Sequence, residues 1–403
     1  MPIRRFSFLV ALAIAGPIAI WLYATLTTPD LLPSADAGQW LAYSRYYSGQ
    51  TWPRYHQPLT VPPLFPSLMA VFASILGPLT AIPVLATLLF VGFCLSTFML
   101  ARELFGDELA ALLTLVLVAV GQSLFLYLIA FGGYLQLMAL LWMNVAFLFW
   151  CRIGNAKGQA WNWWGMAVAT LLVLFSHTPT VIVFLPITGM MVLYLSRKDT
   201  RWDFQFGLRA LKYLMLPVSG WVVYLLLFWD QHMGYATNEA GFYRRGLGDV
   251  LTLFEDNSAR LFLVMGLASL LVLAYVALRN RNHRLRRGAA FIAIWLLVPF
   301  AVMLGTYGLG IGTDYERFGF YFSEPLLLPI AFVFGLLLER WLNLPGSIRE
   351  SNFTWQSILR AGLLPLGLIA FAVFFLLAGL HALTFYPEAL RYFSITNGDA
   401  LLG

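Results

Sequence analysis

Charged residues are scarce in this 403-residue chain. Only 11% of its residues are Asp, Glu, Lys or Arg, and 60% are hydrophobic, whereas soluble domains are about a quarter charged and about half apolar. This composition excludes a water-soluble fold. The chain must satisfy its backbone polar groups inside lipid, and its apolar runs are too long for the strands of a membrane barrel. The sequence therefore predicts an all-α, polytopic transmembrane fold.

Cysteine is also scarce, since Cys94 and Cys151 are the only two in the chain. Both lie in apolar runs, and neither has a cysteine partner in a polar loop. These positions exclude a disulfide framework and a cysteine metal site. We therefore expect both thiols to be packing residues.

Two apolar runs near the N-terminus need separate interpretation. The run 6–26 follows two arginines and lacks a small-residue cleavage site, so we expect it to remain as a helix and not to be removed as a signal peptide. The run from Leu64 to Gly77 has fourteen residues, fewer than the roughly twenty needed to cross a bilayer. We expect this second run to lie along the membrane interface.

The long apolar run 165–195 is divided by the polar turn Ser176-His177-Thr178-Pro179. We expect His177 to be a turn residue whose ring bonds to backbone. With this division the chain has about eleven spans. The expected spans are 6–26, 79–100, 109–130, 134–151, 161–177, 179–195, 211–229, 261–278, 288–306, 318–338 and 361–382.

The positions of Lys and Arg predict the orientation, because these residues prefer the cytoplasmic side of a membrane. With a cytoplasmic N-terminus, 18 of the 25 Lys and Arg fall inside, with seven of the 19 acidic residues. The cytoplasmic face then carries a net charge of +11 and the external face −5, and the basic run 279–287 is the strongest anchor. We expect a plasma-membrane protein with an external C-terminus and no nucleic-acid partner.

The first external segment, residues 27–63, concentrates polar chemistry near the membrane. It carries Asp30 and Asp36, then a Trp- and Tyr-rich stretch, then a proline-rich run. A carboxylate just outside a span can bind a divalent cation or act as a general base. Alternatively, Asp36 begins a short interfacial helix and only complements the helix dipole.

Two later external segments hold further candidates. The loop 230–259 has mixed charges typical of a solvated surface, and His232 and Glu239 are its best candidates because they lie near the end of a span. Arg317 opens the tenth expected span, and Glu324 follows about two turns deeper, where a charge is costly unless it is paired or lines a wet cavity. These two residues either form a functional site or only join helices.

Five segments of the sequence, taken in their order along the chain, form a pattern. After the first span and its acidic loop come YHQPLTVPPLFPSLMAVFASILGP and a second span ending in FMLARELFGDELAALL. FGGYLQLMALLWMNVAFLF, SHTPTVIVFLP and YERFGFYFSEPLLLPIAFVFGLLLERW follow. In this order the phrases resemble the GT-C superfamily of membrane glycosyltransferases, which includes oligosaccharyltransferase catalytic subunits and protein mannosyltransferases. The resemblance covers residues 1–340, and 341–403 add a cytoplasmic loop, a last span and a short external tail.

The resemblance implies a sugar donor on a polyprenyl phosphate and an active site that opens to the external side. The catalytic aspartate of the first external loop matches Asp36 best, with Asp30 second. The late arginine matches Arg317, whose guanidinium can bind a phosphate diester through paired hydrogen bonds. Aromatic rings, among them Tyr43, would stack on the sugar. The expected substrate-binding residues are Trp40, Tyr55, His56, His177, His232, Glu239, Arg317 and Glu324.

The chain departs from the GT-C pattern in two places. No large soluble domain follows the last span. Some members carry a further Asp-x-Asp metal pair where this chain has Gly132, Gly133, Tyr134 and Gln136. Two interpretations of Asp36 therefore stay open, a base without a metal or, with Glu239, a ligand of a divalent metal.

The sequence thus predicts transfer of a sugar from a polyprenyl-phosphate carrier to an acceptor on the external face. Two other classes remain as alternatives. One is a non-catalytic member of the same fold that assembles with membrane-protein partners, which the small number of acidic residues favours. The other is a transporter in which Glu324 and Asn144 line a pathway, although the sequence has no convincing inverted repeat.

Overall fold

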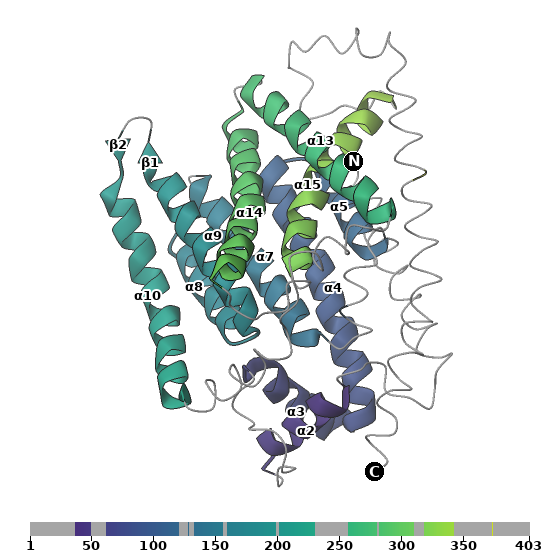
Figure 1. Ribbon diagram of the computed structural model, residues 1–403, viewed down its shortest axis with the longest axis vertical. Helices are drawn as coiled ribbons and strands as arrows, with labels where there is room; N and C mark the ends of the chain where they lie inside the picture. Colours follow the sequence, from purple (N-terminus) through teal and green to yellow (C-terminus); the bar gives the residue numbers. More distant parts are fainter. Residues whose placement is uncertain are drawn as a thin grey trace.

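The computed structural model shows a bundle of helices (Figure 1). It describes residues 37–49, 62–120, 128, 133–155, 159–198, 201–229, 257–279, 282–309, 318–341 and 373. The expected first and last spans, 6–26 and 361–382, lie outside this part of the chain apart from residue 373.

The described ranges contain eleven helices and one short hairpin. The hairpin strands β1 (Arg197–Lys198) and β2 (Arg201–Trp202) are antiparallel, with Arg197 opposite Trp202. The helices are α2 (Ala37–Tyr47), α3 (Leu64–Leu76), α4 (Pro78–Phe105), α5 (Glu108–Val120), α7 (Tyr134–Gly154), α8 (Ala160–Leu174), α9 (Thr178–Ser196), α10 (Phe204–Leu227), α13 (Asn257–Arg279), α14 (His283–Gly308) and α15 (Phe318–Trp341).

Seven of the described helices are long and apolar enough to cross a membrane, namely α4, α7, α9, α10, α13, α14 and α15. Each coincides with a span expected from the sequence. α5 and α8 have 13 and 15 residues, so they cover roughly 20 Å and 22 Å of a hydrocarbon core about 30 Å thick. The chain is therefore a multi-pass helical membrane protein, and the expected count of eleven spans is not confirmed.

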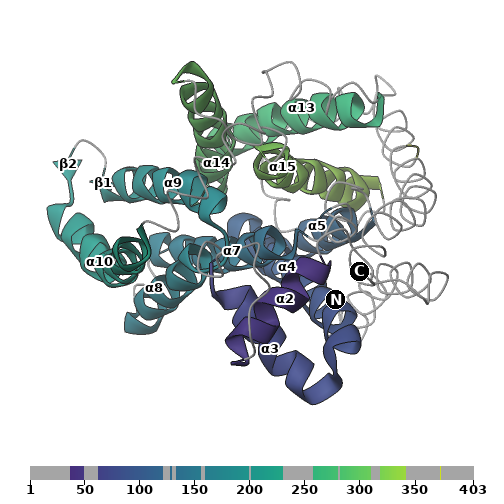
Figure 2. The ribbon, with the colours of Figure 1, turned by 60° about the horizontal axis from the view of Figure 1, so that its bottom comes forward.

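Three helices, α4, α7 and α15, form the centre of the bundle, and α10 lies at its edge (Figure 2). In the most apolar 18-residue stretch of each helix, 61 to 72% of the residues are buried in α4, α7 and α15, against 11% in α10. Aromatic packing joins the central α7 to its neighbours. Phe147 contacts Phe184 of α9 and both Phe291 and Trp295 of α14, with ring centroids 4.9 to 5.7 Å apart. The exposed face of α10 is left for lipid.

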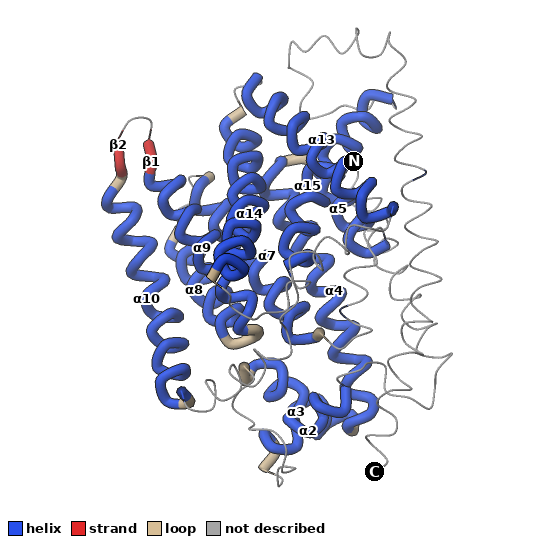
Figure 3. The backbone as a smooth tube through the Cα atoms, viewed as in Figure 1, coloured by secondary structure: helices blue, strands red, loops and turns tan. Residues whose placement is uncertain are grey.

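The short helices α2 and α3 lie at the opposite end of the bundle from the β1–β2 hairpin (Figures 1 and 3). Trp40 of α2 packs edge-on against Phe65 of α3, and Phe65 packs against Tyr134 of α7, with centroids 5.8 and 5.5 Å apart. Gly77 separates α3 from α4 with φ +80°, a conformation that glycine adopts readily because it has no Cβ. The chain therefore changes direction between α3 and the first long span.

The two ends of the bundle differ in charge. We call the end with the hairpin the hairpin pole and the end with α2 and α3 the α2–α3 pole. The described ranges contain fourteen Lys and Arg, and twelve lie in the hairpin or in the helix halves nearest to it. The other two are Arg45 of α2 and Arg260 at the opposite end of α13. The basic connections that the sequence groups on one side thus meet in space.

Three arginines at the start of α14 bond to the C-terminal ends of other helices, and we call them the capping arginines. The last carbonyl groups of a helix have no partner within it, and the helix dipole favours a cation there. α14 therefore ties together α4, α13 and α7 at the hairpin pole. The acceptors are the carbonyls of Arg102 and Glu103 for Arg284 (2.8 and 2.7 Å), of Ala277 and Leu278 for Arg286 (3.1 and 2.9 Å), and of Gly154 for Arg287.

Candidate functional site

Three of the ten site residues predicted from the sequence, Trp40, His177 and Glu324, lie in the described part of the chain. Asp36 directly precedes α2 in the sequence, and Arg317 directly precedes α15. The predictions that fall outside the described residues are Asp30, Asp36, Tyr55, His56, His232, Glu239 and Arg317.

Glu324 of α15 is completely buried among the three central helices. Its Oε1 accepts a hydrogen bond from Thr97 Oγ1 of α4 at 3.1 Å and another from Asn144 Nδ2 of α7. Asn144 Nδ2 also donates to Thr97 Oγ1 at 2.9 Å. Thr97 and Asn144 are completely buried as well. We call Thr97, Asn144 and Glu324 the buried polar cluster.

The buried polar cluster lies deep in the bundle. Asn144 is ten residues from each end of α7, which is about 15 Å along the helix in either direction. No Lys, Arg or His occurs in the membrane-embedded stretches of the described helices around the cluster. These stretches are 79–101 of α4, 109–120 of α5, 135–150 of α7, 261–278 of α13 and 288–306 of α14.

Two oxygens of the buried polar cluster, Glu324 Oε2 and Asn144 Oδ1, have no hydrogen-bond partner in the described part of the chain. The hydrogen-bond donors of the cluster do not serve these two oxygens. Asn144 has two amide hydrogens, which serve Glu324 Oε1 and Thr97 Oγ1, and Thr97 has a single hydroxyl hydrogen. A buried carboxylate that is not paired is costly inside a membrane. Among the described residues, the cluster therefore has a surplus of acceptor oxygens and no cationic side chain to balance them.

His177 occupies the turn between α8 and α9 at the α2–α3 pole, as the sequence predicts, and it is 6% exposed. The sequence predicted a bond from its ring to backbone, whereas the ring contacts the side chain of Thr180. Its Nδ1 lies 2.8 Å from Thr180 Oγ1, which lies 2.7 Å from the hydroxyl oxygen of Tyr321. Tyr321 is the fourth residue of α15, one turn before Glu324. A series of polar groups therefore runs from the pole toward the buried polar cluster.

The same turn is attached to α3. The Leu64 N–H donates to the carbonyl of Phe175 at 3.2 Å, two residues before His177. The start of α3, the α8–α9 turn and the start of α15 thus meet at the α2–α3 pole.

Trp40 and Tyr43 are buried packing residues in this structure, and the stacking of these rings on a sugar stays a prediction. Trp40 is 7% exposed and Tyr43 is 1% exposed. Their ring centroids are 5.8 Å apart, and Trp40 also covers Phe65. At the end of the same helix, burial raises the pKa of Tyr47 to about 12, which favours the neutral phenol.

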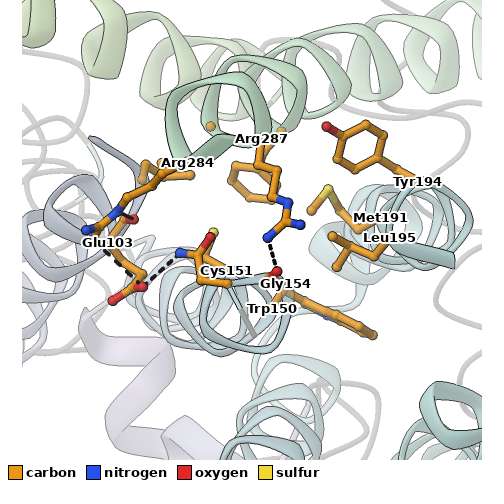
Figure 4. A pocket seen from close by; sticks show the side chains of 13 residues that line it. Glu103, Trp150, Cys151, Gly154, Met191, Tyr194, Leu195, Arg284 and Arg287 are labelled. Carbon is orange, nitrogen blue, oxygen red and sulfur yellow. Dashed lines mark hydrogen bonds and ion pairs between the residues drawn. The ribbon is translucent and has the colours of Figure 1, made fainter. Parts of the chain in front are cut away.

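A small pocket at the hairpin pole lies between α4, α7, α9 and α14 (Figure 4). The cavity has a volume of about 20 Å³. It can therefore hold a water molecule but not a phosphosugar. Glu103 lies 3.8 Å from the guanidinium groups of Arg152 and Arg284 and accepts a hydrogen bond from Asn155 at 3.0 Å. Since Arg284 and Arg287 are bound to carbonyl groups there, the pocket is part of the helix-joining arrangement.

No group of three His, Cys, Asp or Glu side chains forms a metal site within the described ranges. The two ligands expected from the sequence, Asp36 and Glu239, lie outside those ranges. Divalent-metal binding by these two residues therefore stays a prediction.

The sequence analysis did not identify Thr97, Thr180 or Tyr321, and it named Asn144 only for the transporter alternative. All four are polar residues in strongly apolar runs. Such residues in a membrane span mostly face the bundle interior and find hydrogen-bond partners there. That rule could have selected them, but it could not have paired residues 180 and 227 positions apart.

No protein-family model matches this chain, and no curated protein matches its sequence. The fold and the described site define a class of protein. The chain is a multi-pass helical membrane protein with a basic pole, an opposite pole built on two short helices, and a polar cluster buried among its central helices.

Proposed function

We propose that this chain is a GT-C-like membrane glycosyltransferase. It transfers a sugar from a polyprenyl-phosphate carrier to an acceptor at the α2–α3 pole. That pole faces the outside of the plasma membrane, and the basic hairpin pole faces the cytoplasm. Asp36 accepts the proton of the acceptor hydroxyl or holds a divalent metal, and Arg317 binds the donor phosphate.

The arrangement at the α2–α3 pole is the observation that carries this proposal. α2 packs on α3, Leu64 of α3 bonds to the α8–α9 turn, and that turn is linked through Thr180 to Tyr321 of α15. Asp36 directly precedes α2 and Arg317 directly precedes α15. The residue expected to act on the acceptor and the residue expected to bind the donor are therefore next in sequence to elements that are connected at one pole.

The two faces of α3 also support the proposal. Phe65 and Met69 are completely buried against the bundle, whereas Val71 and Ile75 are 55% and 74% exposed. Residues four apart share a helix face, so α3 has one face for protein and one apolar face for lipid. We propose that α3 lies in the outer membrane interface, where a lipid-linked donor would approach the site.

In the proposed reaction the acceptor oxygen attacks the anomeric carbon of the donor sugar. The bond from that carbon to the phosphate oxygen breaks, and the polyprenyl phosphate leaves. Removing the acceptor proton and balancing the charge on the leaving phosphate are the main requirements. A carboxylate and a guanidinium supply these two effects.

Transfer by the purified chain in proteoliposomes tests the proposal. The donors are glucose, mannose and galactose linked to polyprenyl phosphate, with radiolabel in the sugar. Asp36→Asn keeps the shape of the side chain but removes the base, so transfer should fall by about 100-fold or more. Arg317→Lys should weaken donor use, because an ammonium cannot reproduce the planar fork of a guanidinium.

Two matched variants serve as controls. Asp30→Asn removes the second-ranked aspartate, and Glu108→Gln removes an exposed carboxylate at the hairpin pole. Neither should change transfer if Asp36 is the base. Wild-type transfer by a folded Asp36→Asn protein would show that Asp36 has no catalytic role. Wild-type protein that neither binds nor transfers any of these donors would overturn the proposed activity.

A transporter is the second candidate, and the buried polar cluster favours it. Polar and ionisable residues at this depth mark many substrate and ion pathways. Solute uptake into protein-containing vesicles, with Asn144→Leu as the variant, distinguishes this function from sugar transfer. Uptake that depends on Asn144, together with no transfer from any donor, would favour the transporter.

A further inference from the structure

We propose that the buried polar cluster binds one exchangeable monovalent cation, a sodium ion or a proton, held between Glu324 and Asn144. In the described part of the chain these residues leave two oxygens without partners, and the described stretches around them hold no basic side chain. It is independent of sugar transfer and of solute transport.

The chemistry of the cluster suits a small hard cation. A carboxylate, an amide oxygen and a hydroxyl oxygen are the kinds of ligand that such ions take in proteins. Among the described residues Glu324 Oε2 and Asn144 Oδ1 are both without partners, and they belong to side chains that are hydrogen-bonded to each other. A single positive charge there would neutralise the carboxylate and occupy the free oxygens together.

The balancing charge has no source in the described helices packed around the cluster. Their membrane-embedded stretches contain no Lys, Arg or His. Two ionisable groups of the described helices lie one turn from the cluster, the Cys94 thiol before Thr97 on α4 and the Tyr321 phenol before Glu324 on α15. Neither group carries a positive charge in any protonation state. An ion from solution is therefore the natural partner of the carboxylate.

The polar groups at the α2–α3 pole provide a direction of approach. His177, Thr180 and Tyr321 lie in hydrogen-bond contact, and Tyr321 is one turn from Glu324. On α7, Gln136 is buried and shares a face with Asn144, two turns nearer the same pole. The only imidazole in this series is that of His177. Any measurement against pH must therefore distinguish the titration of His177 from that of Glu324.

Thermal unfolding of the purified full chain in detergent tests the proposal. Sodium chloride replaces N-methyl-D-glucamine chloride at constant ionic strength and fixed alkaline pH, and a second series varies pH without sodium. A cation that binds only the folded state raises the melting temperature as its concentration rises. We expect wild-type protein to be stabilised by sodium or, if the occupant is a proton, by acid alone.

The variants locate the effect. Glu324→Gln should remove the response to the cation, and Thr97→Val, which keeps the carboxyl, should raise the half-maximal concentration about tenfold or more. Glu103→Gln removes a carboxyl at the hairpin pole and should leave the response unchanged. Thr97→Val alone decides the matter if Glu324→Gln does not fold, because loss of a supporting hydroxyl should weaken the cation response in a folded protein.

Two results would overturn the proposal. One is an equal response to sodium and to pH in the wild type, Glu324→Gln and Thr97→Val proteins. The other is a response to pH that disappears in His177→Gln and persists in Glu324→Gln, since it would belong to the imidazole. Binding of radioactive sodium at one ion per chain would identify the occupant as sodium, and acid stabilisation without sodium binding would identify it as a proton.

Discussion

Replacement of the capping arginine Arg284 by methionine should destabilise the bundle measurably. The guanidinium donates to the carbonyls of Glu103 and Arg102 at 2.7 and 2.8 Å, and its ion pair with Glu103 spans 3.8 Å. Hydrogen bonds to charged groups contribute about 1.5 to 3 kcal/mol each. The Arg284 side chain is 37% exposed, so solvent screening lowers the total, and we expect a loss of about 1 to 3 kcal/mol.

Unfolding in mixed micelles by increasing denaturing detergent measures this change. Arg284→Lys keeps the charge but not the two-point geometry, so it should lose about half as much as Arg284→Met. Arg209→Met is the matched control, because Arg209 is an exposed cation of α10 with no recorded partner among the described residues. Its replacement should change stability by less than about 0.5 kcal/mol. Equal stability of the Arg284→Met and Arg209→Met proteins would refute the capping argument.

Three further predictions concern packing and sidedness. Gly288→Ala should lower the free energy of unfolding in detergent by about 1 to 3 kcal/mol, because the added Cβ would lie 3.1 Å from a carbonyl oxygen of α4. The matched control Gly305→Ala places its Cβ in open space, so it should be neutral or stabilising. Cysteines placed at His283 and Ser74 should be labelled by an impermeant reagent from opposite sides of the membrane, with Ser74 reacting in intact cells; labelling of both from one side would refute the topology. Trp40→Ala should lower the free energy of unfolding by about 3 kcal/mol, because it removes the packing of α2 on α3. Proteolysis should then cut α2 faster, and unchanged protease resistance of α2 would contradict the prediction.

The sequence predicted the long spans well, because a continuous apolar run is a direct consequence of lipid burial. α9 and α14 follow the expected runs closely. α10 is the poorest match among the seven long helices, since it begins at Phe204 where the sequence predicts a span from 211. Hydropathy reports which residues tolerate lipid and says little about where a helix ends inside a bundle.

The site was harder to predict than the spans. The cost of burying Glu324 was evident from its place in an apolar run, and the structure confirms that it is buried. Its partners could not be deduced, because Thr97 and Asn144 come from two other helices and no periodicity connects them. The packing of Trp40 on Phe65 could not be deduced for a related reason, since an aromatic ring suits a sugar and a protein interface equally well.

The capping arginines also have a consequence for assembly during synthesis. Arg284 lies 181 residues after Glu103, and Arg287 lies 133 residues after Gly154. At about 5 to 20 residues per second, a ribosome needs roughly 10 to 40 seconds to make the longer interval. During that time α4 and α7 have already been made, but the capping arginines that bond to their terminal carbonyls have not. The arrival of α14 therefore provides the partners of these carbonyls before the central helix α15 is made, and chains that stop before α14 should be the preferred targets of membrane quality control.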